Sequence, residues 1–225
     1  MEQKEDAVNP PQEKASPGPR RYDSRGRRAQ AERTRARIVE VARERFLRDG
    51  YATTTVAAIA GDAQVSVETV YKAFGGKPGL VRAIVAAGLE GAGPVPAERR
   101  SDHLTATEAD PRRIIHGWTR LAMEVAPRVA PVELLVRDAG VGDPQMADLY
   151  EEIEQARLDR MTDNARRFAE GGHLRPGLTV DDAATVMWTY TAPVLYELLV
   201  LRRGLTVEQY ADFTESALVS ALLAP

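Results

Sequence analysis

The side chains best suited to chemistry in this sequence are a group of hydroxyl and amino groups in the first third of the chain. Ser66 and Thr69 carry hydroxyls, Tyr71 can donate a hydrogen bond to a phosphate, and Lys72 can add positive charge. Lys77 is followed by a proline, which favours the first turn of a helix, where exposed backbone N–H groups also bind phosphate. The chemistry predicted by this group is hydrogen bonding and charge neutralisation on a nucleic acid.

Residues that would support catalysis or metal binding show no matching pattern. His103, His116 and His173 lack the spacing of a metal site, and the chain has no cysteine. Ser101 has no nucleophile-elbow sequence around it, and Gly75-Gly76 lacks the lysine and hydroxyl of a phosphate-cradling loop. We therefore predict no catalytic residue, no metal, no cofactor and no enzyme activity.

Two apolar stripes with helical spacing come before this polar group. They consist of Ile38, Val41, Ala42 and Phe46, and of Val56, Ile59, Ala60 and Ala63. Gly50 can end the first helix because glycine tolerates a left-handed backbone. A threonine of the run that ends at Thr55 can cap the second helix.

A third helix is expected from about Val67 to Phe74, with Ser66 as its cap. Val67, Val70 and Phe74 share one side of this helix and are predicted to face inward. The opposite side then carries Glu68, Thr69, Tyr71, Lys72 and Ala73. Only a few residues separate the second and third helices, which is typical of a helix-turn-helix whose second helix enters the major groove of DNA.

The pattern DGYATTTVAAIAGDAQVSVETVYKAFGGKPGLV resembles the DNA-binding domain of the tetracycline-repressor (TetR) family of bacterial transcription regulators. The resemblance implies an all-α homodimer of about nine helices, with an N-terminal DNA-binding domain and a C-terminal domain for ligand binding and dimerisation. It implies DNA contacts by Thr55, Ser66, Thr69, Tyr71, Lys72 and Lys77. Val67 and Glu68, on the same helix, complete the predicted DNA-binding set.

The sequence departs from the family pattern at three positions. Gln64 stands in the turn where the family usually has glycine, and a non-glycine residue costs about 1 kcal/mol more in a left-handed conformation. Gly61 is a poor helix former inside the second helix. Ala73 replaces the family's common histidine, so that contact cannot be transferred to this chain. We interpret the motif as softened and still functional.

The charge is divided unevenly between two expected parts of the chain. Residues 1–82 carry five more positive than negative side chains, and residues 83–225 carry eight more negative than positive ones. This division suits a protein that places one end on phosphate, although chance asymmetry is the alternative. We predict a DNA-binding domain in 29–82 and a helical ligand-binding and dimerisation domain in 83–225.

Residues 1–28 are predicted to form a disordered basic arm, because they are rich in polar residues and proline and nearly free of large apolar side chains. The arginines of the arm are Arg20, Arg21, Arg25, Arg27 and Arg28. Two alternatives stay open. The arm either follows the phosphate backbone or minor groove of DNA, or is a solvated leader without DNA contact.

The C-terminal part is predicted to be helical throughout, with a loose connection over residues 91–109. Its five expected helices are 111–126, 129–140, 144–171, 181–203 and 206–223, separated by glycine and proline. The last two are the most apolar, so two such helices from each of two chains can form a four-helix bundle. The candidate dimer residues are Tyr190, Val194, Leu198, Phe213 and Leu218, with packing inside one chain as the alternative.

The remaining helices could enclose an apolar pocket with a few polar anchors, which is the usual form of a small-molecule site. The candidate lining residues are Trp118, Met123, Leu135, Tyr150, Met161, Met187 and Trp188, and the candidate anchors are His116, Arg137, Asp138 and Arg157. For each lining residue the alternative is ordinary core packing. The pocket itself is an expectation from the family resemblance.

The N-terminus lacks the apolar core of a signal peptide, and no apolar run is expected to reach the length of a membrane span. We therefore predict a cytoplasmic protein without a membrane partner. The predicted function is sequence-specific DNA binding to regulate transcription, as a homodimeric repressor on a palindromic double-stranded operator, released by a small-molecule effector. The alternative is a helical module that binds a small molecule or partner protein and carries a vestigial DNA-binding head.

Overall fold

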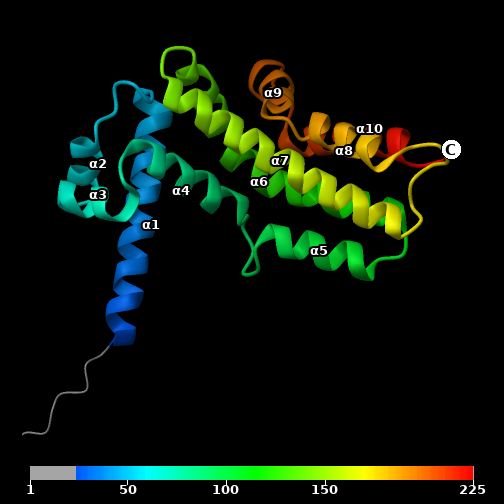
Figure 1. The fold of residues 1–225 in the computed structure, drawn as a ribbon, viewed down its shortest axis with the longest axis horizontal. Coiled ribbons are helices and arrows are strands. Elements are labelled where there is room, and N and C mark those ends of the chain that lie inside the picture. Colours follow the sequence, from blue (N-terminus) through cyan, green and yellow to red (C-terminus); the bar gives the residue numbers. More distant parts are fainter. Residues whose placement is uncertain (1–23, 225) are drawn as a thin grey trace, which may run out of the picture.

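The computed structural model describes residues 24–224, and in that range the fold is entirely helical (Figure 1). The N-terminal domain consists of α1 (Ser24–Asp49), α2 (Val56–Asp62), α3 (Val67–Phe74) and α4 (Lys77–Leu89). The C-terminal domain consists of α5 (Ala97–Thr107), α6 (Pro111–Gly140), α7 (Pro144–Glu170), α8 (Val180–Tyr190), α9 (Pro193–Tyr196), the π-helical segment η1 (Glu197–Arg202) and α10 (Val207–Leu222). The prediction of an all-α protein is confirmed.

The core of the N-terminal domain forms where α1 crosses the short helices. Ile38, Ala42 and Phe46 of α1 are buried against residues of α2, α3 and α4, and the Phe46 ring lies 5.4 Å from the ring of Tyr51. The predicted inner faces of α1 and α2 are therefore largely correct; Val41 is only partly buried. The core continues through α4 into α6 and α7, so one apolar cluster joins the two domains.

α1 begins earlier than predicted, because residues 24–28 of the expected disordered arm are helical. This part of α1 extends beyond α2 and α3 (Figure 1). Arg28 makes an exposed i,i+4 ion pair with Glu32 over 3.3 Å, which supports a helical start. Arg20 and Arg21 lie outside the described residues, so the arm hypothesis remains a prediction.

The connection expected over residues 91–109 is mostly a helix, α5, which corrects that prediction. Arg100 on α5 makes two hydrogen bonds to the carboxylate of Glu124 on α6, over 2.9 and 2.6 Å. Asp102 pairs with Arg160 on α7 over 2.8 Å. The hydrogen bonds from Arg100 hold the pKa of Glu124 at about 2. The helix is therefore fixed by partners far away in sequence, which local helix signals do not reveal.

α6 is one helix of 30 residues, although the sequence predicted a break near Pro127. Both Pro127 and Pro131 lie inside it, and each removes the amide proton that would bond the carbonyl four residues earlier. Val129, between the two prolines, is buried, and so are Val132 and Leu134, which follow the second proline. Burial against α4, α7 and α10 outweighs the loss of two backbone hydrogen bonds.

The helix predicted over 181–203 is instead broken into α8, α9 and η1. Thr191 ends α8, and Pro193, which has no N–H, begins α9. The final helix, α10, agrees with the prediction and starts with a capping box between Thr206 and Gln209. The irregular backbone between α8 and η1 buries Pro193 and Tyr196 and leaves Val194 exposed.

The stretch Val180–Arg202 is long and apolar enough, by length and composition alone, to cross a membrane. The expectation that no apolar run reaches such a length was wrong for this stretch. The test is weak evidence for a span, because α8 packs against α7 and α10 in the same way as a core helix. Only 22% of its most apolar window is buried, however, so much apolar surface is uncovered in a single chain.

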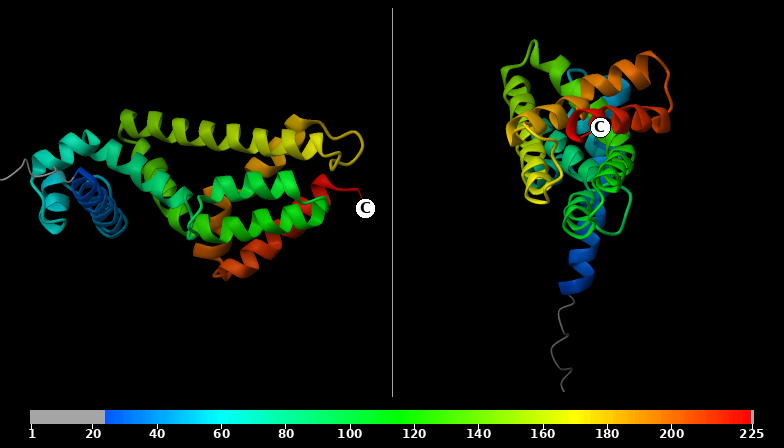
Figure 2. Two further views of the ribbon diagram at one scale, coloured as in Figure 1. Left: turned by 90° about the horizontal axis from the view of Figure 1, so that it is seen from below. Right: turned by 90° about the vertical axis from the view of Figure 1, so that its right-hand side faces the viewer.

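The molecule is elongated, with the N-terminal domain at one end (Figure 2). α6 and α7 run side by side along the C-terminal domain, and α4 packs on α6. The C-terminus lies at the end far from α2 and α3 (Figure 1). The two domains touch where α4 packs on α6 and α7 and where α1 packs on α6, so a signal to α3 can pass through these contacts.

Candidate nucleic-acid interface

Side-chain caps fix where α2 and α3 begin. The Thr55 hydroxyl accepts a hydrogen bond from the amide of Ala58 over 3.1 Å. The Ser66 hydroxyl accepts one from the amide of Thr69 over 3.1 Å and lies 2.8 Å from the Thr69 hydroxyl. Because each cap satisfies an otherwise unpaired N–H, both helices have a defined first turn. Thr55 and Ser66 thus have a structural role in addition to their predicted DNA contacts.

The outer face of α3 is free of the protein core. Glu68, Thr69, Tyr71 and Lys72 are exposed, and Tyr71 shows 53% of its surface. Phe74 and Val70 are buried on the opposite side, as predicted. The helix therefore presents short polar groups near its start and a phenol and an ammonium group further along, as major-groove reading requires.

Val67 does not face inward, which corrects the prediction from helical spacing. It is 40% exposed, whereas Val70 on the same side is fully buried. Val67 is the first residue of α3, and the core packs along the later turns of the helix. Its exposure leaves its methyl groups available, in agreement with its place in the predicted DNA-binding set.

The turn between α2 and α3 is built at Gln64, whose φ is +53°. This is the left-handed conformation that glycine adopts readily, and Gln64 is the one residue other than glycine with positive φ in the described part of the chain. The amide of Val65 bonds the carbonyl of Ala60 over 3.0 Å and closes the turn. The helix-turn-helix is thus formed despite the missing glycine.

Lys77 is held by the protein in this structure. Its Nζ donates a hydrogen bond to the carbonyl of Tyr51 over 2.6 Å and lies 4.1 Å from the centre of the Tyr51 ring. Burial lowers the pKa of this ammonium group. Its side chain therefore ties the start of α4 to the α1–α2 connection, and a phosphate contact would use its remaining N–H groups.

Two arginines brace α3 and α2 against α1. Arg35 donates a hydrogen bond to the carbonyl of Ala73 over 2.9 Å, and its guanidinium lies 4.3 Å from the centre of the Phe74 ring. Arg45 bonds Asp62 over 2.7 Å. Arg35 satisfies a carbonyl at the C-terminal end of α3, where positive charge is favourable. Nothing in the local sequence pattern indicates this contact, because the partners are 38 residues apart.

Gly79 and Gly88 allow close contacts on either side of α4. A Cβ at Gly79 would lie 1.7 Å from the carbonyl oxygen of Phe74, so α4 can follow α3 this closely only with glycine there. A Cβ at Gly88 would lie 2.6 Å from a methyl group of Val129 on α6. The sequence analysis missed both, since a glycine inside a helix gives no sign of what it touches.

α4 is also joined to the C-terminal domain by a bidentate ion pair. Arg82 donates to both carboxylate oxygens of Glu152 on α7, at distances between 2.7 and 3.2 Å. Both side chains are about half exposed, so the pair contributes little stability and mainly fixes geometry. With the Gly88–Val129 contact, it makes α4 a direct physical link between α3 and the C-terminal domain.

An exposed recognition helix, a capped helix-turn-helix and an all-helical second domain define a class: a DNA-binding transcription regulator with a second helical domain. Residues 38–84 match the family model of the bacterial regulatory proteins of the tetR family. This stretch, which spans α2, α3 and most of α4, is thus similar to the DNA-binding domain of the tetR-family regulators. Compared by sequence with curated proteins, the chain matches none.

Solved structures extend the fold match to most of the chain. A TetR-family transcriptional regulator from Syntrophomonas wolfei is 17% identical, with a TM-score of 0.69 over 84% of this chain and 94% of the other. The complex of SmeT with triclosan is 20% identical, with a TM-score of 0.66 over 85% and 92%. A transcriptional regulator from Saccharomonospora viridis in complex with choline is 20% identical, with a TM-score of 0.63 over 86% and 100%.

The predicted pocket residues are spread over the interior of the C-terminal domain. Trp118, Met161 and Met187 belong to one apolar cluster, in which the Trp118 ring lies 5.2 Å from Phe168. Tyr150 packs against the other main cluster, together with Leu135. Met123 on α6 is partly buried, and Trp188 lies under the guanidinium of Arg157 at 4.8 Å. The structure does not bring all seven around one cavity, and their role remains a prediction.

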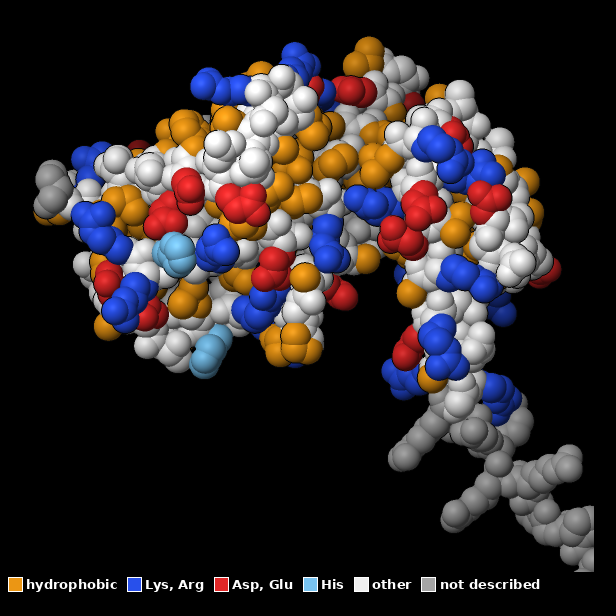
Figure 3. All heavy atoms as spheres, turned by 180° about the vertical axis from the view of Figure 1, so that it is seen from behind, with side chains coloured by type: hydrophobic (Ala, Val, Ile, Leu, Met, Phe, Trp, Pro, Cys, Tyr) orange, Lys and Arg blue, Asp and Glu red, His pale blue; other side chains and the backbone are white. Residues whose placement is uncertain are grey.

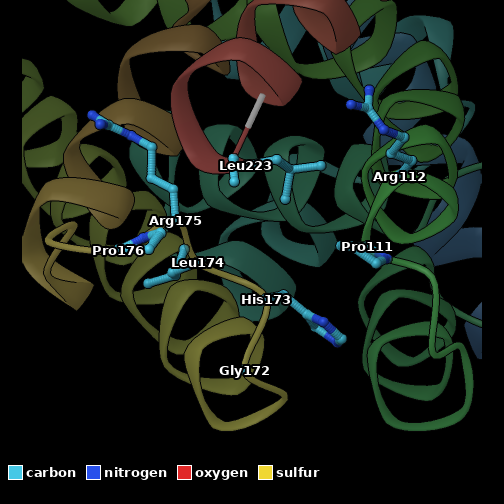
Figure 4. A pocket seen from close by; sticks show the side chains of 9 residues that line it. Pro111, Arg112, Gly172, His173, Leu174, Arg175, Pro176 and Leu223 are labelled. Atoms are coloured by element: carbon cyan, nitrogen blue, oxygen red, sulfur yellow. The ribbon is translucent and has the colours of Figure 1, made fainter.

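Two surface hollows are open in this structure. One, of about 290 Å³, lies at the end far from α3 and is lined by Arg112, His173, Arg175 and neighbouring residues (Figure 4). The other, of about 610 Å³, lies between the domains and includes Leu135 of the predicted pocket set. Two predicted anchors, Arg137 and Asp138, also line the second hollow, and Arg137 bonds Glu197 over 3.1 Å.

The predicted dimer residues fall into two groups. Val194, Leu198 and Phe213 are 44%, 49% and 45% exposed, and Tyr190 lies 6.4 Å from the Phe213 ring. Leu218 is only 3% exposed and packs in its own chain's core, so it has no surface to offer a partner. Helical spacing identified the apolar residues of α10 and could not decide which side of the helix turns inward.

Proposed function

We propose that the protein is a homodimeric repressor that binds a palindromic operator and releases it when a small molecule occupies the C-terminal domain. The observation that carries this proposal is the exposed α3, whose first turn is capped by Ser66 and whose Tyr71 and Lys72 are directed away from the core with Thr69. Structural neighbours solved with triclosan and with choline support a ligand-binding role for the C-terminal domain. Such a regulator acts in the cytoplasm, where DNA is accessible.

The uncovered apolar surface of the C-terminal domain supports the dimer. Val194, Leu198, Leu201 and Phe213 come from η1, its flank and α10, and each shows at least 44% of its surface. Figure 3 shows hydrophobic side chains gathered on the face of the C-terminal domain that is hidden in Figure 1. A second copy would cover this apolar surface and place two α3 helices about 34–36 Å apart, the distance between half-sites one helical turn apart.

Release from DNA follows from the position of α4. This helix contacts α3, α6 and α7, so a shift of α6 or α7 changes the angle at which α3 is presented. A ligand that binds one arrangement more tightly shifts the population toward it, and only that difference in affinity can lower operator binding. The Arg82–Glu152 pair and the Gly88–Val129 contact are the connections through which such a shift would pass.

Selection of bound sequences from a random pool of duplex DNA tests the DNA-binding part. The expected result is an inverted repeat, and Lys72→Ala should lower the slope of log affinity against log salt by about one. Tyr71→Phe should weaken binding about two- to ten-fold, because only one hydrogen bond is lost. Glu151→Gln, on the exposed side of α7, is the control. A chain that binds small molecules and ignores duplex DNA in dilute buffer would instead be a binding module with a vestigial head.

Sedimentation tests the dimer independently. The double variant Leu198→Glu, Phe213→Glu should be monomeric and should lose its preference for the inverted repeat, because buried like charges oppose association. Val141→Glu is the matched control, since Val141 is 93% exposed on the α6–α7 turn. A double variant that remains dimeric would place the interface elsewhere.

A further inference from the structure

A group of charged and polar side chains lies in the interior of the C-terminal domain. Glu133 of α6 has only 6% of its surface exposed. Glu154 and Arg157 of α7 have side chains 20% and 12% exposed, and Trp188 of α8 lies beneath the guanidinium. Charged groups are rarely buried unless each has a partner, so the hydrogen bonds of this group decide what it is for.

Arg157 has most of its donors engaged. Its Nη2 bonds Glu154 over 2.5 Å, and its Nη1 bonds the carbonyl of Trp188 and the hydroxyl of Thr191. Three buried atoms nearby have no hydrogen-bond partner in the part of the chain that the structure describes: Nε of Arg157, Oε1 of Glu154 and Nε1 of Trp188. A buried polar atom left in this way destabilises the fold, so the arrangement is incomplete as it stands.

Glu133 is the least satisfied of the four. Among the described residues its carboxyl has no hydrogen-bond partner, although the charges of Arg157 and Glu154 act on it. Burial raises the pKa of Glu133 to about 7. Arg157 is already committed to Glu154, so two carboxyl groups share one cation. When both carboxyl groups are ionised, this interior therefore lacks one positive charge.

The backbone near the group departs from a regular α-helix on two sides. Pro127 and Pro131 of α6 remove the amide protons that would bond the carbonyls four residues before them. On the other side, the chain changes from α8 to α9 at Thr191 and then to the π-helical η1, a conformation frequently found at functional sites. The hydrogen bond from Arg157 to the hydroxyl of Thr191 joins this irregular backbone to the group.

Apolar surface adjoins the group on both sides along α7. Tyr150 and Ile153 precede Glu154 and pack in one apolar cluster, and Met161 follows Arg157 and packs in the other. A molecule centred at Glu133 would therefore have aromatic and aliphatic side chains around any hydrocarbon part. This combination of apolar walls with a few charged anchors is typical of small-molecule sites.

We propose that this interior group is the effector site of the regulator and that the effector is an organic cation, an ammonium or guanidinium group on an apolar body, held by Glu133. The inference rests on the proposed function and adds to it the chemical class of the effector. An anionic effector would meet two carboxyl groups, and three of the five N–H groups of the Arg157 guanidinium are already bonded.

The place of Glu133 on α6 also connects this site to DNA binding. Val129 lies one helical turn before Glu133 and is the residue against which Gly88 of α4 packs. The tightness of that contact leaves α4 little freedom to move independently of α6. A cation that draws Glu133 toward α7 and α8 therefore shifts the surface on which α4 rests.

Binding of the cation is linked to a proton. Near pH 6 the Glu133 carboxyl carries a proton, because its pKa is about 7. A cation beside it favours the charged form, so binding releases up to about one proton per site at that pH. The groups that also act on this part of the interior are Arg157, Glu154 and Tyr150 of α7, Arg137 of α6 and Tyr210 of α10.

The test uses three probes with one skeleton: 4-phenylbutylammonium, 4-phenylbutanol and 4-phenylbutyrate. Calorimetric titration of the full-length protein at pH 6 and pH 8 measures affinity, and titration in two buffers of different ionisation enthalpy measures proton release. The variant is Glu133→Gln, which keeps the shape and removes the charge. Glu151→Gln, a neutralised and exposed glutamate on α7, is the matched control.

The expected result is that the cation binds the wild type at least about ten-fold more tightly than either other probe. It should bind more tightly at pH 8 than at pH 6, with proton release only at the lower pH. Glu133→Gln should lose both the preference and the proton release, and Glu151→Gln should keep both. Equal or tighter binding of the anion or the alcohol, no cation binding, or an unchanged Glu133→Gln overturns the proposal.

Operator binding, measured in the same preparations, keeps this test separate from the proposed function. A protein that selects an inverted repeat and fails the probe test is a DNA-binding regulator with another kind of effector. A protein that passes the probe test and ignores duplex DNA contradicts the proposed function and leaves the cation site in place.

Discussion

The N-terminal domain and the interior of the C-terminal domain differ in whether their buried polar groups have hydrogen-bond partners. In the N-terminal domain, the buried hydroxyl of Thr54 bonds the carbonyl of Gly50 over 2.8 Å, and the partly buried ammonium of Lys77 bonds Tyr51. All five buried side-chain atoms without a partner in residues 26–224 lie in the C-terminal domain, on Trp118, Glu154, Arg157, Trp188 and Thr214.

This difference fits two kinds of task. A domain that reads base edges must hold its side chains in fixed positions before it meets DNA, and satisfied hydrogen bonds and caps achieve this. A domain that responds to a ligand gains affinity and a change of state from groups that the ligand completes. The stability of the two domains should therefore respond in different directions to changes at their buried polar or tightly packed positions.

The largest effect is expected from Gly79→Ala in the N-terminal domain. The added Cβ would lie 1.7 Å from the carbonyl oxygen of Phe74, a backbone atom that cannot move without displacing α3 or α4. We expect a loss of about 3 kcal/mol or more in the free energy of unfolding, and loss of operator binding. Thermal and denaturant unfolding measure the first effect.

Gly61→Ala is the matched control for that change. Gly61 lies inside α2 and has nothing within 4 Å of an added Cβ. Alanine should therefore stabilise the helix by about 1 kcal/mol. If Gly79→Ala were as mild as Gly61→Ala, the close approach of α3 and α4 would not exist as described.

A slightly smaller effect is expected from pH acting on Glu133. Burial raises its pKa to about 7 in the folded state, whereas the unfolded value is near 4.5. The folded protein therefore binds more protons between these values, and its stability falls as pH rises through that window. The full difference corresponds to on the order of 3 kcal/mol, at about 1.4 kcal/mol for each pH unit.

The measurement is the difference in melting temperature between wild type and Glu133→Gln from pH 4.5 to pH 8. The wild type should lose stability relative to the variant up to about pH 7 and stay level above it. Glu151→Gln, which removes an exposed carboxyl, should follow the wild type. Parallel curves for wild type and Glu133→Gln would show that burial does not raise the pKa of this carboxyl.

Ser66→Ala should cost about 1 kcal/mol, because the amide of Thr69 loses its hydrogen-bond acceptor at the start of α3. Operator affinity should fall with it, since the first turn of α3 carries the residues that approach the bases. Ser66→Asp, which can still accept that bond, is the comparison and should keep the stability. A Ser66→Ala variant as stable as the wild type would mean that the cap does not hold α3.

The smallest effect is expected from Gln64→Gly. Gln64 has a φ of +53°, which costs a residue with a side chain about 1 kcal/mol relative to glycine. The greater freedom of glycine in the unfolded chain offsets part of this gain. The melting temperature should therefore stay the same or rise slightly. A clear fall would contradict the left-handed turn.

Much of the N-terminal domain was predictable from short-range signals. The caps at Thr55 and Ser66, the end of α1 at Gly50 and the outward face of Tyr71 depend on residues within a few positions of one another. Prediction failed where a distant contact decides. Spacing alone placed Val67 inward, although the core does not reach the first turn of α3.

The sequence by itself determined that this chain is helical, that it carries a helix-turn-helix, and which polar side chains of α3 face away from the core, because those features follow from local periodicity and capping. Only the tertiary structure decided that α6 continues through two prolines, that Gly79 lies against Phe74, and that Glu133 is buried between helices. The physical reason is that burial and close approach depend on residues far apart in the chain, whose contacts no local pattern encodes.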